Sequence, residues 1–351
     1  MRTIVTTMRN EAPFILEWIA YHRAIGFTDF LVYTNDCNDG TDLLLDRLEQ
    51  LGIVSHVPNP RRGKKPVQWT ALKRAANHPA VRKADWVFVA DVDEFLNIHA
   101  GDGHLDDLFA AHPDADGFHL SWRMFGANGR TAFEDQPVTE QFTTAAPAAL
   151  VWPWRAVQFK SLYRNSGPSH KLGVHAPQRG PGAGIWVDDN GHITADVQGT
   201  VMVHSAPRYR LAQINHYALG SAESFLVKCD RGRPNHTDQA IDLAYWLDRN
   251  LNAVEDTSIQ RHAKATAADF AALMADPVIA DLHAKGVSWR KARIAALMLE
   301  PDFFYLFAQI TQASPTQVLA MDQQQEMLNK LFLMRRAQMQ AEATAKAPGK
   351  P

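Results

Sequence analysis

Two carboxylates on alternate residues, Asp91 and Asp93, follow directly after the apolar run 86–90. The run is rich in β-branched and aromatic side chains, which is typical of a buried strand in a parallel sheet. Open α/β sheets bind their ligands at the carboxyl ends of such strands. Mg²⁺ or Mn²⁺ held there by one or two carboxylates keeps coordination positions for phosphate oxygens, so the pattern predicts a metal site for a nucleotide diphosphate. The competing interpretation is that both aspartates cap a helix beginning near Glu94.

The composition is that of a globular enzyme. The 351 residues suffice for one large domain and an extension. A formal net charge of -2 offers no general attraction to nucleic acid, which is not predicted as a partner. Cys37 and Cys229 form no disulfide framework, no run reaches transmembrane length, and the polar start offers no signal peptide. We therefore expect a cytoplasmic protein without a transmembrane segment, and peripheral association with a membrane stays open.

Strands and helices alternate along the first part of the chain. Apolar runs typical of strands occupy residues 3–7, 29–35, 54–57, 86–90 and 117–122. Apolar residues at helical spacing occupy 14–25, 41–51 and 67–78. Short links between alternating strands and helices imply right-handed crossovers, so the predicted fold class is α/β with a mostly parallel sheet.

Motifs after three of these strands resemble the GT-A-fold glycosyltransferases. They are Asn10-Glu11, the loop 35–41 and the segment 91–96. Further segments at 120–129 and 214–228 resemble a bacterial family-2-like group related to glycosyltransferase family 92, and this collinear set is more specific than any one motif. The resemblance implies a Rossmann-like sheet flanked by helices. It also implies inverting transfer of a sugar from a nucleotide-sugar donor, UDP-linked, to a glycan, lipid-linked or other hydroxyl acceptor in bacterial surface polysaccharide or glycoconjugate synthesis.

The resemblance assigns the metal ligands. Asp91 and Asp93 would bind Mn²⁺ or Mg²⁺, and His216 would be the third ligand, because several GT-A enzymes use a histidine from this part of the chain. A single histidine among fifteen is otherwise more often a structural residue. His175 and His204 are the alternatives for this role.

Contacts to the donor are implied for residues in loops at the same edge of the sheet. They are Glu11, Asn35, Asp36, Lys65, Gly126, Asn128 and Lys228. Turn-rich loops meet the nucleoside in the resembled fold, glycines admit a ligand close to the backbone, and basic residues stabilise the leaving nucleotide. Plainer interpretations also exist. Asn128-Gly129 is a strong turn dipeptide, and the basic run 61–65 is by default a solvated face.

The catalytic base is predicted among the carboxylates that follow the glycine loop. An inverting transferase needs one carboxylate to accept the proton of the acceptor hydroxyl. Asp135 or Glu134 stands where some GT-A enzymes keep this group. The competing carboxylates are Asp188, Asp189, Asp196 and Glu223.

The character of the sequence changes near residue 256. Residues 1–255 predict the catalytic domain, 256–336 an all-helical extension, and 337–351 a disordered tail with too little apolar material to fold. Two other functions are compatible with the motifs. One is a nucleotidyltransferase of similar sheet architecture, and the other is a non-catalytic nucleotide- or sugar-binding protein derived from this fold.

Overall fold

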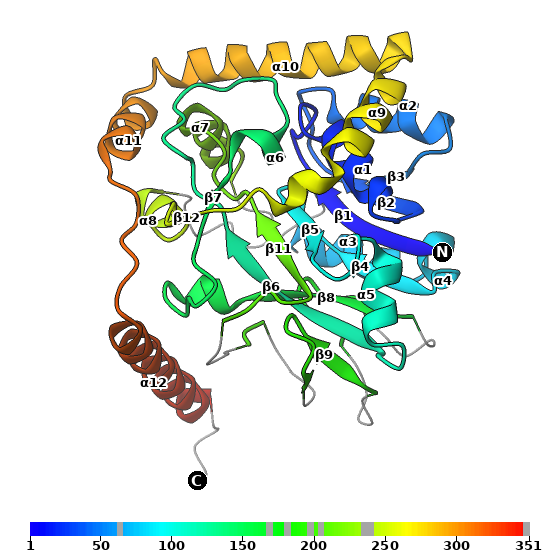
Figure 1. Ribbon diagram of the computed structural model, residues 1–351. Helices are drawn as coiled ribbons and strands as arrows, with labels where there is room; N and C mark the ends of the chain where they lie inside the picture. The colour runs from blue at the N-terminus through cyan, green and yellow to red at the C-terminus, as the bar shows by residue number, and fades with distance from the viewer. Residues whose placement is uncertain are drawn as a thin grey trace.

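The computed structural model describes residues 1–61, 66–165, 171–178, 184–194, 200–202, 207–232 and 242–346, with a β-sheet at its centre and helices around it (Figure 1). The strands are β1 (Arg2–Met8), β2 (Asp29–Thr34), β3 (Ser55–Pro58), β4 (Trp86–Val89), β5 (Glu94–Ile98), β6 (Gly117–Met124), β7 (Thr144–Ala145), β8 (Phe159–Arg164), β9 (Trp186–Asp188), β10 (Ile193–Thr194), β11 (Ala212–His216) and β12 (Val254–Glu255). The α-helices are α1 (Ile15–Ala24), α2 (Thr41–Gln50), α3 (Val67–Ala75), α4 (Pro79–Arg82), α5 (Leu105–Ala111), α6 (Val138–Gln141), α7 (Ala222–Arg231), α8 (Leu243–Leu247), α9 (Ala263–Met274), α10 (Pro277–Leu297), α11 (Pro301–Gln312) and α12 (Met321–Lys346). Two short 3₁₀ helices span Trp154–Val157 and Ser258–His262.

The described strands form a ten-stranded sheet in the order β10-β9-β6-β8-β4-β1-β2-β3, with β11 pairing to both β5 and β6, and a separate β7–β12 pair. β3, β2, β1 and β4 are parallel neighbours, as the alternating pattern predicts. β8 lies antiparallel between β4 and β6. The predicted fold class, an α/β protein with a mostly parallel sheet flanked by helices and further helices at its C-terminal end, is confirmed, although the sheet is mixed beyond β4.

Both faces of the parallel strands are buried. Ile4 of β1 and Phe88 of β4 belong to the core that includes α1 and α2, whereas Val5 and Val87 pack with residues of α3. Alternate residues of a strand point to opposite faces. Strands covered on both faces have near-continuous apolar runs, which is the pattern that the sequence shows.

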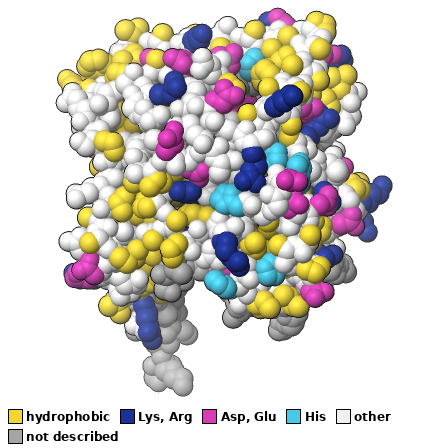
Figure 2. All heavy atoms as spheres, viewed as in Figure 1, with side chains coloured by type: hydrophobic (Ala, Val, Ile, Leu, Met, Phe, Trp, Pro, Cys, Tyr) yellow, Lys and Arg dark blue, Asp and Glu magenta, His cyan; other side chains and the backbone are white. Residues whose placement is uncertain are grey.

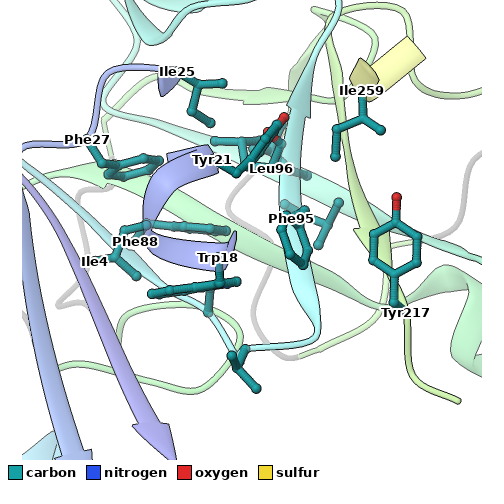
Figure 3. Close-up of a cluster of buried hydrophobic side chains, with 14 of the residues drawn as sticks. Ile4, Trp18, Tyr21, Ile25, Phe27, Phe88, Phe95, Leu96, Tyr217 and Ile259 are labelled. Atoms are coloured by element: carbon teal, nitrogen blue, oxygen red, sulfur yellow. The ribbon is translucent and has the colours of Figure 1, made fainter. Parts of the chain in front are cut away.

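Helix α1 is tied to β5, the strand that follows the two aspartates. The Trp18 indole donates to the backbone oxygen of Glu94 at 3.0 Å, and the Tyr21 hydroxyl donates to that of Leu96 at 2.8 Å. Figure 3 shows Trp18 and Tyr21 in the same buried cluster as Phe95, with 5.4 Å between the ring centroids of Tyr21 and Phe95. Because these hydrogen bonds are buried, they fix the start of β5 and the turn before it.

Helix α10 crosses the molecule from α2 to α7 (Figure 1). At its N-cap, Asp276 pairs with Arg47 of α2 at 2.5 Å. Near its other end, Arg293 pairs with Asp230 of α7 at 2.6 Å. The helix is therefore attached to an early and a late part of the sheet domain.

Helix α12 begins in the predicted extension, where Leu328 is buried with Val151 and Val157. It continues to Lys346, whereas the sequence predicts a disordered tail from residue 337. The reason for the difference is that Ala, Gln and Glu are strong helix formers, and they prolong a helix that packing has already started. Residues 347–351 lie outside the described ranges, and the division at residue 255 stays a prediction.

Acidic and basic side chains are interspersed over the face seen in Figure 2, in keeping with the formal net charge of -2. Within the described ranges, no single helix is long and apolar enough to cross a membrane. Helices α10 and α11 satisfy length and composition only as a pair, and this pair is bent by 99°.

The first prediction concerns the close approach of α10. A Cβ added at Gly286 would lie 2.5 Å from the Cβ of Ala12 and 3.4 Å from the backbone oxygen of Asp39. Gly286→Val should therefore lower the free energy of unfolding by about 1–3 kcal/mol through overpacking, as measured by urea denaturation. Ala292→Val changes an exposed position of the same helix. It should lower the free energy of unfolding only by the small difference in helix propensity between Ala and Val. Equal losses in both variants would contradict this account.

Candidate active site

The two aspartates lie in a tight turn between β4 and β5. The Glu94 N–H donates to the Asp91 backbone oxygen at 3.1 Å, and the Asp91 N–H donates to Glu94 Oε2 at 2.9 Å. Glu94 is the first residue of a strand, so the competing interpretation of a helix capped by Asp91 and Asp93 is wrong. The turn leaves the two side chains free to face different partners.

Asp91 faces a buried lysine. Lys160 Nζ lies 3.2 Å from Asp91 Oδ2 and 3.1 Å from Glu94 Oε2, and the side chains of both Lys160 and Glu94 are 0% exposed. The Gln68 amide donates to the other oxygen of Asp91 at 3.1 Å. Lys160 reaches this position because β8 runs antiparallel beside β4, with Leu162 opposite Phe88. Its side chain then stands at the end of β4.

Burial and neighbouring charges shift the pKa values of Glu94 and Lys160 in opposite directions. Burial raises the pKa of Glu94 to about 8, although the ammonium of Lys160 works against the shift. Burial alone would lower the pKa of Lys160, but the carboxylates of Asp91 and Glu94 outweigh it and raise that pKa. Lys160 is therefore a permanent buried cation that needs these carboxylates as partners.

Asp93 faces the opposite side, toward β11 and α7. Lys228 Nζ lies 2.6 Å from Asp93 Oδ2, and His216 Nε2 lies 3.8 Å from the same oxygen. The Tyr217 N–H donates to the Asp93 backbone oxygen at 2.9 Å, and His216 is the register partner of Glu94 in the β5–β11 pair. Strand pairing thus brings His216 beside Asp93, while its role as a metal ligand stays a prediction.

The charge states of Asp93 and His216 suit the binding of a cation. Burial would raise the pKa of Asp93, but Lys228 and His216 outweigh it and lower that pKa to about 2. Burial lowers the pKa of His216 to about 3, so its imidazole is neutral at physiological pH. Its buried Nδ1 has no hydrogen-bond partner among the described residues. A carboxylate and a neutral imidazole fit Mn²⁺ or Mg²⁺ as two ligands, with further positions for phosphate oxygens.

Asp91 is not part of that pair, because its two oxygens are held by Lys160 and Gln68. Within the described ranges, no group of three or more His, Cys, Asp or Glu residues is arranged to hold a metal ion. Of the alternatives to His216, His175 donates from Nδ1 to the backbone oxygen of Phe159 at 2.8 Å, and His204 lies outside the described residues.

A pocket opens beside Asp93. Its apolar wall contains aromatic side chains from four parts of the chain, namely Phe14, Phe95, Phe133, Phe142 and Tyr217. Its charged groups are Glu11, Asp93, Glu134, Lys228, Arg231 and Arg290. A largely apolar pocket with a few convergent charged groups is the usual form of a small-molecule site.

The predicted donor contacts divide between the pocket and the surface. Glu11 lines the pocket in an ion pair with Arg231, and Lys228 lines it beside Asp93. The Asn35 amide donates to Asp36 at 3.0 Å in a loop where Asp36 has a φ of 48°. Lys65 lies outside the described residues.

The glycine loop makes contacts within the protein. A Cβ at Gly126 would lie 2.3 Å from Asn252 Oδ1, and the N–H of Asn128 donates to that same oxygen at 2.9 Å. Asn128 and Gly129 both have positive φ, and the Arg130 N–H donates to the Ala127 oxygen at 2.9 Å. This geometry is a type I′ turn, so the turn interpretation of Asn128-Gly129 is confirmed.

The structure separates the two predicted bases. Glu134 lines the pocket with its side chain 48% exposed and lies 3.3 Å from Arg130. Asp135 lies 3.3 Å from His283 of α10 and is not among the residues that line the pocket.

The competing carboxylates have structural partners or lie elsewhere. Glu223 accepts the Phe133 N–H at 2.8 Å, and Asp188 accepts the N–H groups of Asn190 and His192. Asp189 is buried, and Asp196 lies outside the described residues.

Two functional residues escape prediction from the sequence. Lys160 has a recognisable signal, since it is a charged residue within the strand-forming run 159–163. Arg290 has another, since it falls at helical spacing with Gly286, Val287 and Ile294 on the buried stripe of α10. A charged residue in an apolar pattern marks a side chain with a specific buried partner.

The fold and the pocket define an α/β protein with a charged, cation-compatible site at the carboxyl end of β4. The sequence profile described as glycosyltransferase family 92 matches residues 5–205, and the chain belongs to this family. A family 92 protein of Oryza sativa subsp. japonica is 31% identical over 153 residues, covering 41% of this chain and 25% of that protein. A family 92 protein of Arabidopsis thaliana is 29% identical over 156 residues, covering 40% of this chain and 26% of that protein. The chain thus spans about a quarter of the length of these plant relatives.

Solved structures show only a distant likeness. TarS of S. aureus, residues 1-349, has a TM-score of 0.32 at 12% identity, over 89% of this chain and 88% of that one. HddC from Yersinia pseudotuberculosis has a TM-score of 0.30 at 8% identity, over 54% and 89%. Membership of family 92 therefore rests on the sequence match.

The second prediction concerns Lys160. Removal of one partner of a buried ion pair leaves uncompensated charge, so Lys160→Met should lower the free energy of unfolding by about 3–5 kcal/mol near pH 8. The pKa of Glu94 is raised from 4.5 when folded, so the stability that it contributes is present below 4.5 and is lost as pH rises through about 8. Near pH 5 the free energy of unfolding of Lys160→Met should accordingly be closer to that of the wild type.

Urea denaturation at the two pH values measures this effect. The double variant Lys160→Met, Glu94→Gln removes the buried carboxylate as well, and it should recover much of the loss near pH 8. A loss that does not depend on pH and is not relieved by Glu94→Gln would mean that packing, not charge, explains the effect of Lys160→Met.

Proposed function

We propose that the protein transfers a sugar from a nucleotide-sugar donor to a hydroxyl acceptor, with inversion at the anomeric carbon. The position of Asp93 and Lys228 in the lining of one pocket, with His216 beside Asp93, supports this proposal most directly. Membership of family 92 adds to it. A UDP-linked donor, a glycan or lipid-linked acceptor, a cytoplasmic location, peripheral membrane association and a role in bacterial surface polysaccharide or glycoconjugate synthesis stay predictions.

The basic residues of the pocket bind the donor in this mechanism. Lys228 presents its ammonium to the diphosphate while Asp93 keeps it in place, and Arg231 is oriented by Glu11. These cations stabilise the charge that develops as the bond between the sugar and the diphosphate breaks. Mn²⁺ or Mg²⁺ held by Asp93 and His216 would supply further positive charge to the leaving group. Asp91 stays a predicted ligand whose orientation depends on Lys160.

Glu134 is the base that the geometry favours. It lines the pocket, and its carboxylate accepts the proton of the acceptor hydroxyl as that oxygen bonds to the anomeric carbon.

The third prediction tests the carboxylate that faces the pocket. Asp93→Asn should reduce transfer by at least about a hundredfold, because a neutral amide is a poor metal ligand and no longer holds the Lys228 ammonium beside the leaving diphosphate. Chelator should abolish transfer in the wild type, and His216→Ala should need more Mn²⁺ for the same rate. Product analysis with radiolabelled nucleotide sugars and a panel of glycans measures the transfer.

Asp302→Asn provides the matched control, since it changes an exposed aspartate of α11. It should transfer sugar at the wild-type rate. Undiminished turnover of Asp93→Asn would refute the assignment, and incorporation of a nucleoside monophosphate with release of pyrophosphate would identify a nucleotidyltransferase instead.

The fourth prediction separates the two adjacent carboxylates. Glu134→Gln should lower kcat by roughly a hundredfold or more while donor affinity stays unchanged, because only proton transfer is lost. Asp135→Asn, its matched neighbour, should retain most of kcat. The reverse result in steady-state kinetics would give the role of base to Asp135.

A further inference from the structure

Helix α10 contributes one charged residue, Arg290, to the pocket that Asp93 and Lys228 also line. This residue lies outside residues 5–205, the range that matches the family profile. Its side chain is 5% exposed, and its guanidinium lies 4.7 Å from the ring centroid of Phe14 and 5.4 Å from that of Phe133. The extension therefore supplies part of the pocket wall and is more than a cover over the outer helices.

The hydrogen bonds of Arg290 leave part of the guanidinium for a ligand. Nη2 donates to the backbone oxygen of Ser224 at 3.1 Å, and Nε lies 3.4 Å from Ser224 Oγ. No hydrogen bond of Nη1 occurs within the described part of the chain. Nη1 is not completely enclosed by protein atoms, and Arg290 lines the pocket, so this nitrogen is available to a ligand there.

Each carboxylate of the pocket already has a basic partner. Asp93 pairs with Lys228, Glu11 with Arg231, and Glu134 with Arg130. Arg290, by contrast, makes no ion pair with a carboxylate in the described ranges.

Asp39 is the acidic residue whose charge acts on Arg290, but its carboxylate is already hydrogen-bonded to other groups. It accepts the N–H groups of Ala12 and Thr41, both at 2.9 Å. Burial, and then the neighbouring Arg290, lower the pKa of Arg231 to about 10, so two guanidinium groups repel each other here. An anion in the pocket would relieve this repulsion.

We propose that Arg290 anchors a subsite for an anionic group, a phosphate or a carboxylate, of the ligand that the pocket receives. A bidentate or single charged hydrogen bond from Nη1 suits either group. Only the description of that ligand as a substrate rests on the proposed function. The anionic group has two sources, the diphosphate of the donor and an acidic group on a sugar.

Binding of two probes tests the subsite and distinguishes the sources. Inorganic pyrophosphate represents the diphosphate and glucuronate represents the acidic sugar, with glucose as the neutral control. Affinities come from the rise in melting temperature with probe concentration, in chelator so that no metal contributes. We expect the wild type to bind at least one anion. Arg290→Met should bind that anion about tenfold or more weakly, and Arg290→Lys should recover part of the affinity.

Two variants of the same helix are the controls. Arg293→Met removes a cation that pairs with Asp230 at the surface, and Ile294→Ala lowers stability without reaching the pocket. Both should bind the probes as the wild type does. Loss of pyrophosphate binding alone in Arg290→Met assigns Arg290 to the donor, and loss of glucuronate binding alone assigns it to an acidic sugar.

The proposal is overturned if the wild type binds neither anion, if Arg290→Met binds both normally, or if Ile294→Ala weakens binding equally. The outcome is independent of turnover. A protein that binds anions through Arg290 but transfers no sugar would refute the proposed function alone. Active transferase with unchanged anion binding in Arg290→Met would refute only the subsite.

Discussion

One fully buried lysine determines how the site is arranged. Lys160 lies between Asp91 and Glu94, and the side chains of Lys160 and Glu94 are completely buried. A buried cation needs polar partners beside it, and Lys160 has only Asp91 and Glu94 within ion-pair distance among the described residues, so the turn between β4 and β5 has little freedom. With Asp91 held on one side, Asp93 is left to face β11 and α7. The insertion of antiparallel β8 next to β4 is what brings the lysine there.

The parts of the fold that could be predicted are those where local pattern and burial agree. Strands β1, β2 and β4 are buried on both faces, so their apolar runs predict them. Helix α2 begins at Thr41 as expected. The Asp91–Asp93 motif could be placed at a strand end for the same reason. His216 could be associated with it only through the family resemblance, because the β5–β11 pairing joins residues about 120 positions apart.

The rest depends on contacts between segments that sequence spacing does not reveal. Lys160 looks like one of the alternating residues of an ordinary strand, and only the register of β8 against β4 aims it at Asp91. Glu134 and Asp135 are equivalent in sequence, yet one faces the pocket and the other faces His283 of α10. Gly126 is explained by Asn252, whose side chain occupies the space beside it. In each case tertiary packing decides between neighbours of similar chemistry.

The attachment of α10 also has a consequence for synthesis of the chain on the ribosome. Arg290 completes a wall in which it contacts Phe14, a residue that precedes it by 276 positions (290 minus 14) in the chain. Contacts of such long sequence separation form late, after the entropy of closing the loop between them has been overcome. A nascent chain that already contains Asp93, His216 and Lys228 would still lack this wall until α10 has left the exit tunnel. The finished pocket would thus appear only after α10 has been made.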